Sequence, residues 1–206
     1  YEADNIKRFL ANPLTKHIKF CILYEDTVRL ETVKTFEYDP VNGTTLIPID
    51  DPKNSGRLIS DFEFFAQEFF SHPSYLKIDD RPLVQFDADR HWIGDIEKTV
   101  SQLRDEMKKK GYNLYLVSNI LGWYFPNAPY DLLEVRNRQI VKSMDGISAD
   151  GNMWRPDVEE ARVNFPFFTK HLYEKWYSYA SRINPQIDLL PNIMPGEEIH
   201  LSLVNV

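Results

Sequence analysis

The sequence predicts an α/β fold, and within that class part of a (β/α)8 TIM-type barrel. Three observations lead to this prediction: short apolar runs bounded by turn residues, helical patterns between those runs, and the absence of glycine-rich nucleotide-binding motifs. Short continuous apolar runs are typical of strands buried on both faces of a parallel sheet. Strands that alternate with helices form right-handed βα units. The chain of 206 residues is long enough for one domain of such units, and we expect this domain to cover residues 1–206.

Five strands are expected in chain order. They cover residues 18–24, 83–86, 114–117, 146–148 and 187–193. About five βα units are therefore present, whereas a complete barrel has eight and takes about 250 residues. The chain is predicted to hold only part of a barrel.

Helices are predicted where apolar residues recur with a period of 3.6. An N-terminal helix contains Ile6, Phe9 and Leu10. A second is expected to begin at Ser60, which can form a capping box with Glu63, and to bury a stripe of phenylalanines.

Two further helices are expected later in the chain. One has its apolar stripe at Ile96, Val100, Leu103 and Met107 and ends at Gly111 after three lysines. The other covers 168–179 and is ended by Asn184-Pro185.

A doubly wound open sheet is the competing architecture. Such a sheet is expected to carry Gly-x-Gly-x-x-Gly after an early strand, or a P-loop, and neither motif is present. The barrel is therefore favoured. Residues 27–60 are rich in turn residues and are predicted to form a long loop after the first strand, where barrels build substrate sites.

Charge and hydropathy exclude some classes of partner. The chain has 31 acidic and 24 basic residues, and its basic residues are scattered rather than clustered, which argues against nucleic-acid binding. No apolar run approaches the roughly 18 residues that a membrane-spanning helix needs. Because the sequence begins with Tyr1 rather than Met, we expect the missing strands to come from the rest of a larger parent chain.

Polar residues follow the predicted strands, at the end where parallel βα barrels bind their ligands. They are Glu25, Asp26, Asp87, Asp89, Ser118, Asn119, Asp150 and Asn192. Four aromatic residues lie close to them in the sequence: Trp92, Trp123, Tyr124 and Trp154. Acids and amides that hold hydroxyl groups, beside aromatic faces, suit a sugar ligand.

Structural roles are open for several of these residues. Glu25 could instead cap the following helix or pair with an arginine. Asp87 and Asp89 occupy alternating positions, so we expect at most one to face a ligand, and either could cap a helix. Trp123 and Tyr124 could be loop packing.

Other chemistries find little support. The five histidines lack metal-ligand spacing, so no metal site is expected. No Gly-x-Ser-x-Gly elbow is present. Glycoside cleavage by a pair of carboxyl groups fits the residues best, although the sequence does not identify the pair.

Four segments resemble glycoside hydrolase family 99, the endo-α-mannosidase-like family, and its WbsX-like relatives. The most specific is "FFAQEFFSHPSYLKIDDRPLVQFDA", residues 64–88. "IKFCILYE" resembles the family's strand that ends in an active-site glutamate, "MDGIS" its Asp-Gly-aromatic strand, and "LPNIMPG" its strand ending in Pro-Gly. The segments occur in the family's order.

The resemblance implies a (β/α)8 barrel that acts on α-linked mannose or related glycans without a metal or organic cofactor. Glu25 matches a substrate-binding acid of the family's active site, and Asp80 stands where the family usually has glycine. Cleavage in the family involves the substrate's 2-hydroxyl and a late Glu-Trp-x-Glu-type motif, which this sequence lacks.

We therefore expect a glycan-processing domain with Glu25 as the catalytic or sugar-binding acid. Its substrate-binding residues are predicted to be Asp87, Asp89, Asn119, Trp123, Tyr124, Asp150 and Trp154. Two alternatives remain: a non-catalytic glycan-binding or polysaccharide-assembly module on the same barrel, and a structural α/β domain that binds other proteins.

Overall fold

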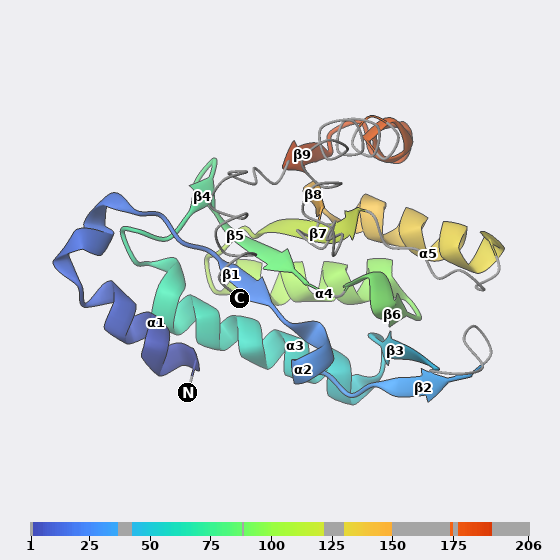
Figure 1. Ribbon diagram of the computed structural model, residues 1–206, viewed down its shortest axis with the longest axis horizontal. Helices are drawn as coiled ribbons and strands as arrows, with labels where there is room; N and C mark the ends of the chain where they lie inside the picture. Colours follow the sequence, from blue (N-terminus) through green and yellow to red (C-terminus); the bar gives the residue numbers. More distant parts are fainter. Residues whose placement is uncertain are drawn as a thin grey trace, which may run out of the picture.

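A parallel sheet forms the centre of the computed structural model, which describes residues 2–36, 43–87, 89–121, 130–149, 174 and 177–190 (Figure 1). Its parallel strands are β1 (Ile22–Tyr24), β5 (Arg81–Phe86), β7 (Tyr115–Leu121), β8 (Gly146–Ala149) and β9 (Asp188–Leu190). Neighbours in the sheet are also consecutive along this series, in the order β1-β5-β7-β8-β9. The predicted α/β class with a parallel sheet is confirmed, but the described residues do not form a closed barrel.

The neighbouring strands β5 and β7 bury apolar side chains on both faces, as their apolar runs predicted. On one face Tyr24, Val84 and Leu116 belong to a large core that includes residues of the helices. On the other face a smaller cluster contains Leu83, Tyr115 and Val117, all of them buried.

The helices pack alongside this sheet (Figure 1). They are α1 (Glu2–Leu10), α3 (Pro52–Phe65), α4 (Ile96–Lys109) and α5 (Tyr130–Ser143), with a further helical stretch over 177–183. Helix α4 contacts both α3 and α5. Gly111 has φ 89°, so the predicted left-handed residue after α4 is confirmed. No helix in the described ranges combines the length and the apolar character needed to cross a bilayer.

The predicted start of the second helix, at Ser60, is wrong. Helix α3 begins at Pro52, and the side chain of Asp51 caps it by accepting a hydrogen bond from the Lys53 backbone N–H at 2.8 Å. Asp before Pro is a strong start signal, because proline suits the first helical turn. Ser60 and Glu63 lie inside the helix, so their capping-box spacing is a coincidence.

The segment 27–60 is more regular than predicted. It contains α2 (Asp26–Arg29), β2 (Val33–Thr35) and β3 (Thr44–Pro48), and β3 pairs in parallel with β6 (Trp92–Ile93). The ring Nδ1 of His91 lies 2.7 Å from the Thr45 carbonyl oxygen. This small sheet therefore ties the long excursion to the residues that follow β5.

The segment that precedes β5 forms a tight hairpin. Strand β4 (Lys77–Ile78) pairs antiparallel with β5, and the two residues between them, Asp79 and Asp80, have φ values of 49° and 61°. Two-residue hairpin turns of this kind require positive φ at both positions. Asp80 thus adopts the left-handed backbone conformation that glycine adopts most readily.

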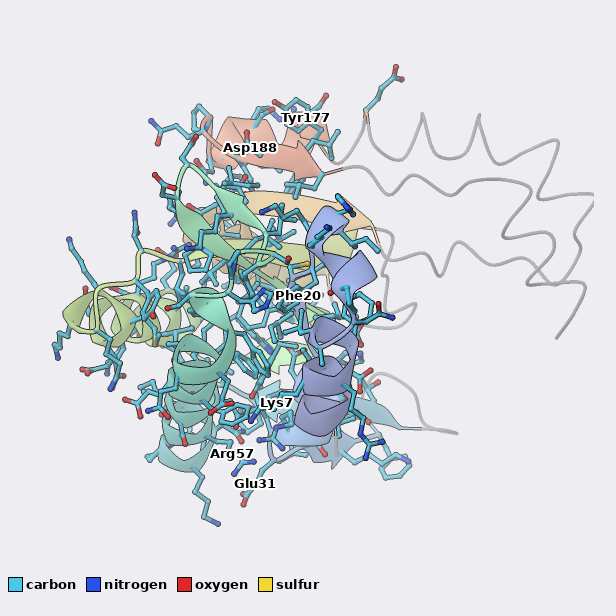
Figure 2. The ribbon with its side chains drawn as sticks, turned by 90° about the vertical axis from the view of Figure 1, so that its left-hand side faces the viewer. Lys7, Phe20, Glu31, Arg57, Tyr177 and Asp188 are labelled. Carbon is cyan, nitrogen blue, oxygen red and sulfur yellow. The ribbon has the colours of Figure 1, made fainter. Side chains whose placement is uncertain are left out.

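Side chains of residues 71–75, Ser-His-Pro-Ser-Tyr, make contacts that stabilise the fold. The His72 ring Nδ1 accepts a hydrogen bond from the Ser74 backbone N–H at 3.0 Å, and the Tyr75 hydroxyl donates to the Leu83 carbonyl at 2.8 Å. Phe20, near the centre of the side view in Figure 2, packs edge-on against the Tyr75 ring at 5.1 Å. These residues stabilise the sheet near its amino end.

Candidate functional site

The carboxyl ends of three neighbouring strands bring together predicted site residues. Glu25 directly follows β1, and Asp87 directly follows β5. The Asp87 backbone N–H donates to the Tyr24 carbonyl at 3.0 Å, and the Asn119 side-chain Nδ2 donates to the Asp87 carbonyl at 3.2 Å. We call Asp87, Asp89 and Asn119 the rim cluster.

Asn119 was predicted to follow its strand, but it lies within the strand. Strand β7 continues to Leu121, and its pairing with β8 shifts between Ser118 and Leu121. The partners of those two residues, Ile147 and Ala149, are separated by one residue fewer, so β7 bulges beside Asn119. Bulges are common at barrel rims and next to active sites, where they change the direction of a side chain.

The rim cluster is mostly buried. Asp89 is 0% exposed and Asn119 is 1% exposed, whereas Asp87 is half-buried. The Asp89 Oδ1 accepts a hydrogen bond from the Asn119 backbone N–H at 3.2 Å. Neither aspartate caps α4, because Asp95 does so by accepting from the Lys98 N–H at 3.1 Å.

Glu25 shares the edge with the rim cluster but faces a different pocket. It is exposed and occupies the N-cap position of α2, yet its side chain makes no capping hydrogen bond. It lines a pocket of about 440 Å³ together with residues of α1, β1 and α3. The residues that line this pocket do not include the rim cluster.

A buried carboxylate, Asp61, organises the wall of that pocket. It accepts hydrogen bonds from the Tyr24 hydroxyl at 3.0 Å and from the Arg29 Nε at 3.0 Å, and it pairs with Arg57 at 3.2 Å. Burial, followed by the charge of Asp61, raises the pKa of Tyr24, so the phenol remains a neutral donor. Asp61 lies in the middle of α3, where no sequence motif pointed to it.

The aromatic candidates are only partly described. Trp123, Tyr124 and Trp154, together with Asp150, lie outside the described residues. Trp92, the fourth aromatic residue considered, is fully buried and packs against Phe86 with ring centroids 4.7 Å apart. It belongs to the core rather than to a ligand-facing wall.

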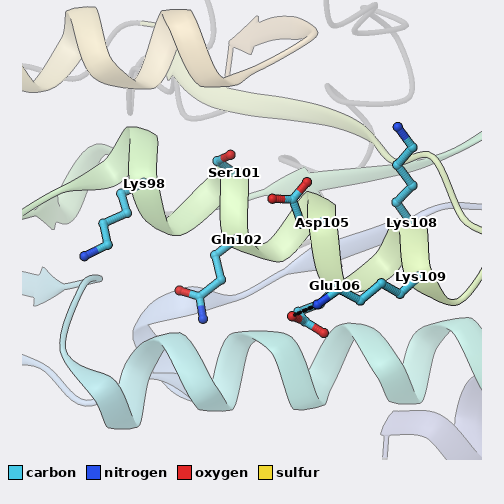
Figure 3. Close-up of a pocket in the computed structure, with 7 residues that line it drawn as sticks. All are labelled: Lys98, Ser101, Gln102, Asp105, Glu106, Lys108 and Lys109. Atoms are coloured by element: carbon cyan, nitrogen blue, oxygen red, sulfur yellow. Dashed lines mark hydrogen bonds and ion pairs between the residues drawn. The ribbon is translucent and has the colours of Figure 1, made fainter.

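A wide depression of about 700 Å³ lies on the outer surface of α4 (Figure 3). Its lining residues all come from this helix and include basic, neutral and acidic side chains: Lys98, Ser101, Gln102, Asp105, Glu106, Lys108 and Lys109. Lys109 pairs with Glu106 at 2.6 Å. The arrangement is that of a solvated helix face, and we assign it no binding role. Within the described ranges, His, Cys, Asp and Glu side chains form no group of three or more that could hold a metal.

The rim cluster offers hydrogen-bonding groups rather than a recognisable catalytic dyad. Carboxylates of Asp87 and Asp89 can accept hydrogen bonds from hydroxyl groups, and Asn119 contributes an amide. The assignments of Glu25, Asp87, Asp89 and Asn119 as site residues remain predictions.

Comparison with known proteins gives one structural neighbour. No protein-family model matches the chain, and no curated protein matches it in sequence. A solved structure named "Glycoside hydrolase-like protein" matches with a TM-score of 0.54 over 77% of this chain, at 18% identity. This chain spans 46% of the length of that neighbour. The resemblance to family 99 remains a prediction, and the α/β fold described here is similar to that of a glycoside hydrolase-like protein.

Proposed function

We propose that this chain is a glycan-processing domain that cleaves or binds α-linked mannose-type glycans. The observation that supports this most is the rim cluster, which gathers two aspartates and an amide at the carboxyl edge of a parallel sheet. Ligand sites of parallel βα folds lie at this edge. The structural neighbour named as glycoside hydrolase-like has a similar fold, and the four family 99-like segments are consistent with the same function.

The architecture that we propose is an incomplete (β/α)8 barrel. Doubly wound sheets reverse their strand order at a switch point, and ligands bind there. The parallel strands of this sheet instead follow one another in chain order from β1 to β9. Such an order is expected for consecutive βα units of a barrel whose remaining strands are supplied by a larger parent chain.

In this proposal Glu25 is the acid that acts on the sugar, and Asp87, Asp89 and Asn119 bind hydroxyl groups. Asp150, Trp123, Tyr124 and Trp154 complete the substrate-binding residues. Glycoside cleavage needs a second carboxyl group on the opposite side of the scissile bond. Asp87 is our candidate for this group, since it follows the neighbouring strand β5, is half-buried, and its backbone N–H donates to the Tyr24 carbonyl of β1.

A non-catalytic glycan-binding module is the second candidate. The separation of Glu25 from the rim cluster into its own pocket favours it, because two catalytic carboxyl groups must face the same glycosidic bond.

Replacing Glu25 with glutamine tests both candidates. We expect Glu25→Gln to weaken binding of α-linked manno-oligosaccharides about tenfold, because an ionised hydrogen-bond acceptor is lost. Titration calorimetry measures the affinity, and release of reducing ends measures cleavage. An enzyme loses turnover in the variant, whereas a binding module shows no cleavage in either protein.

The matched control is Glu31→Gln, which makes the same charge change at an exposed residue paired only loosely with Lys53 at 3.4 Å. It is expected to leave affinity unchanged. If the wild-type protein binds none of the α-linked manno-oligosaccharides, the proposed function fails and the structural α/β domain becomes the better account.

A further inference from the structure

Glu25 lies between two elements that are too short to hold it firmly by themselves. Strand β1 has three residues and, in the described part of the chain, pairs with β5 alone. Helix α2 has four residues, and a single helical turn is not stable in isolation. The Glu25 side chain makes no capping hydrogen bond that would fix it to this turn. The direction of its carboxylate therefore depends on how the residues on either side of it are held.

Asp61 of α3 contacts the chain on both sides of Glu25. Its Oδ2 accepts hydrogen bonds from the Tyr24 hydroxyl and from Arg29 Nε, each at 3.0 Å, and its Oδ1 accepts from Arg29 Nη2 at 2.5 Å. Tyr24 directly precedes Glu25, and the Arg29 backbone N–H donates to the Glu25 carbonyl at 3.1 Å. One carboxylate thus connects the end of β1 to the helical turn that follows Glu25.

Asp61 has little capacity left for a ligand. Its side chain is only 8% exposed, and Arg57 Nε lies 3.2 Å from Oδ1 in addition to the bonds from Tyr24 and Arg29. A carboxylate has about four lone-pair sites, and these partners use them. Hydrogen bonds between charged groups also fix geometry more firmly than neutral ones. Asp61 is therefore suited to hold its neighbours rather than to bind a sugar.

We propose that Asp61 is the positioning residue for Glu25: it holds the backbone on both sides of Glu25, so that the carboxylate keeps one direction at the carboxyl edge of the sheet. The inference rests on the proposed role of Glu25 and adds a residue of α3 that does not itself touch the sugar. Binding groups need to be held within about 0.5 Å of their productive geometry by the residues around them. Loss of Asp61 therefore weakens glycan binding through Glu25.

Hydrogen exchange of two backbone amides tests the positioning without any ligand. The N–H groups of Val28 and Arg29 both donate to the Glu25 carbonyl at 3.1 Å. In Asp61→Asn we expect both amides to exchange at least about tenfold faster than in the wild type, because the turn after Glu25 opens more often. Equal rates in a folded variant would overturn the inference whether or not a glycan binds, and this includes the case in which neither protein protects these amides.

Asp145→Asn is the matched control. It also removes a carboxylate that accepts hydrogen bonds from two arginines, but this carboxylate lies at the amino edge of the sheet. We expect it to destabilise the protein while changing the exchange of the Val28 and Arg29 amides by less than about twofold. Equal acceleration in the two variants would mean that these amides report only global stability, and would overturn the inference.

A double-mutant cycle tests the effect on the glycan. We expect Asp61→Asn to weaken binding of an α-linked manno-oligosaccharide about fivefold in the wild-type background. In the Glu25→Gln background the same change should cost less than about twofold, because the positioned carboxylate is already lost. Titration calorimetry measures each affinity. The full loss in both backgrounds would show that Asp61 acts independently of Glu25 and would overturn the inference, whereas absence of binding by the wild-type protein contradicts the proposed function and leaves hydrogen exchange to decide the inference.

Arg29→Gln covers the case in which Asp61→Asn does not fold. The Arg29 side chain is 40% exposed, so its replacement disturbs the core less, and it removes the charged bonds between Asp61 and the turn. We expect faster exchange of the Val28 amide and the same non-additivity with Glu25→Gln. Wild-type exchange at Val28 in this variant would overturn the inference.

Discussion

Replacing Asp145 with asparagine is expected to lower the free energy of unfolding at pH 7 by about 2–3 kcal/mol. This carboxylate connects three elements at the amino edge of the sheet. It accepts from Arg81 Nη2 at 2.5 Å, from Arg104 Nη2 at 2.7 Å and from the Leu116 N–H at 2.9 Å. Its side chain is 19% exposed, so the estimate lies below that for a fully buried pair.

The same variant should change how stability depends on pH. Burial alone would raise the pKa of Asp145, but the charge of Arg104, the Leu116 N–H and hydrogen bonds from both arginines lower it below its ordinary 3.8. A depressed folded-state pKa contributes stability above the unfolded-state value, and this contribution is lost as pH falls through the folded-state pKa.

Urea unfolding between pH 7 and pH 3 measures both effects. We expect the stability difference between the wild-type protein and Asp145→Asn to shrink as pH falls below about 4. Asp105→Asn, at an exposed position of α4, serves as the control and should change stability by less than about 0.5 kcal/mol. Coincident urea curves for wild type and Asp145→Asn at pH 7 would mean that this network stabilises nothing.

Phe62→Ala is expected to have the largest effect on stability, about 3–5 kcal/mol. Phe62 is 0% exposed, stacks on Phe86 with ring centroids 5.9 Å apart, and meets Tyr24 edge-on at 5.8 Å. Its removal opens a cavity between α3 and the first two strands of the sheet. The lost burial and the cavity both reduce the free energy of unfolding.

Phe64→Ala provides the comparison within the same helix, because Phe64 is 39% exposed. It is expected to cost less than about 1 kcal/mol. Chemical denaturation of both variants gives the difference directly. Similar losses at the two positions would contradict the placement of Phe62 in the core.

Strands that are buried on both faces could be predicted, because such a strand consists of consecutive apolar residues. Residues 114–117 are such a run, all four are buried, and β7 contains the last three of them. The pairing of β3 with β6 could not be predicted, because β6 has only two residues and each pairs with a residue 45 positions earlier. Long-range pairing leaves no local pattern.

The helix boundary at Ser60 illustrates how a local motif can mislead. Its capping-box spacing competes with Asp51-Pro52, and the second signal wins because Asn54 also anchors the first turn. The side chain of Asn54 donates to the carbonyls of Pro48 and Glu31. Those contacts depend on the tertiary fold and could not be inferred from the sequence.

The sequence predicted that the candidate residues lie at one edge of the sheet, but not how they are arranged there. Strand ends indicated Glu25, Asp87, Asp89 and Asn119, because parallel strands bring their carboxyl ends to one edge. The bulge at Asn119 and the separate pocket of Glu25 depend on backbone geometry and on α1 and α3 packing beside β1. Arg81 and Asp145 are 64 residues apart, so their pairing also needed the fold.

The central claim is that the carboxyl edge of the sheet binds glycans. Backbone amide chemical shifts recorded by NMR during titration with an α-linked manno-oligosaccharide test it most directly. We predict that the shifts that change cluster at residues 25–26, 87–91 and 118–119, while those of Arg81, Leu114 and Asp145 at the amino edge stay constant. Saturable binding whose shift changes cluster elsewhere, at the amino edge or on the outer face of α4, would contradict the account.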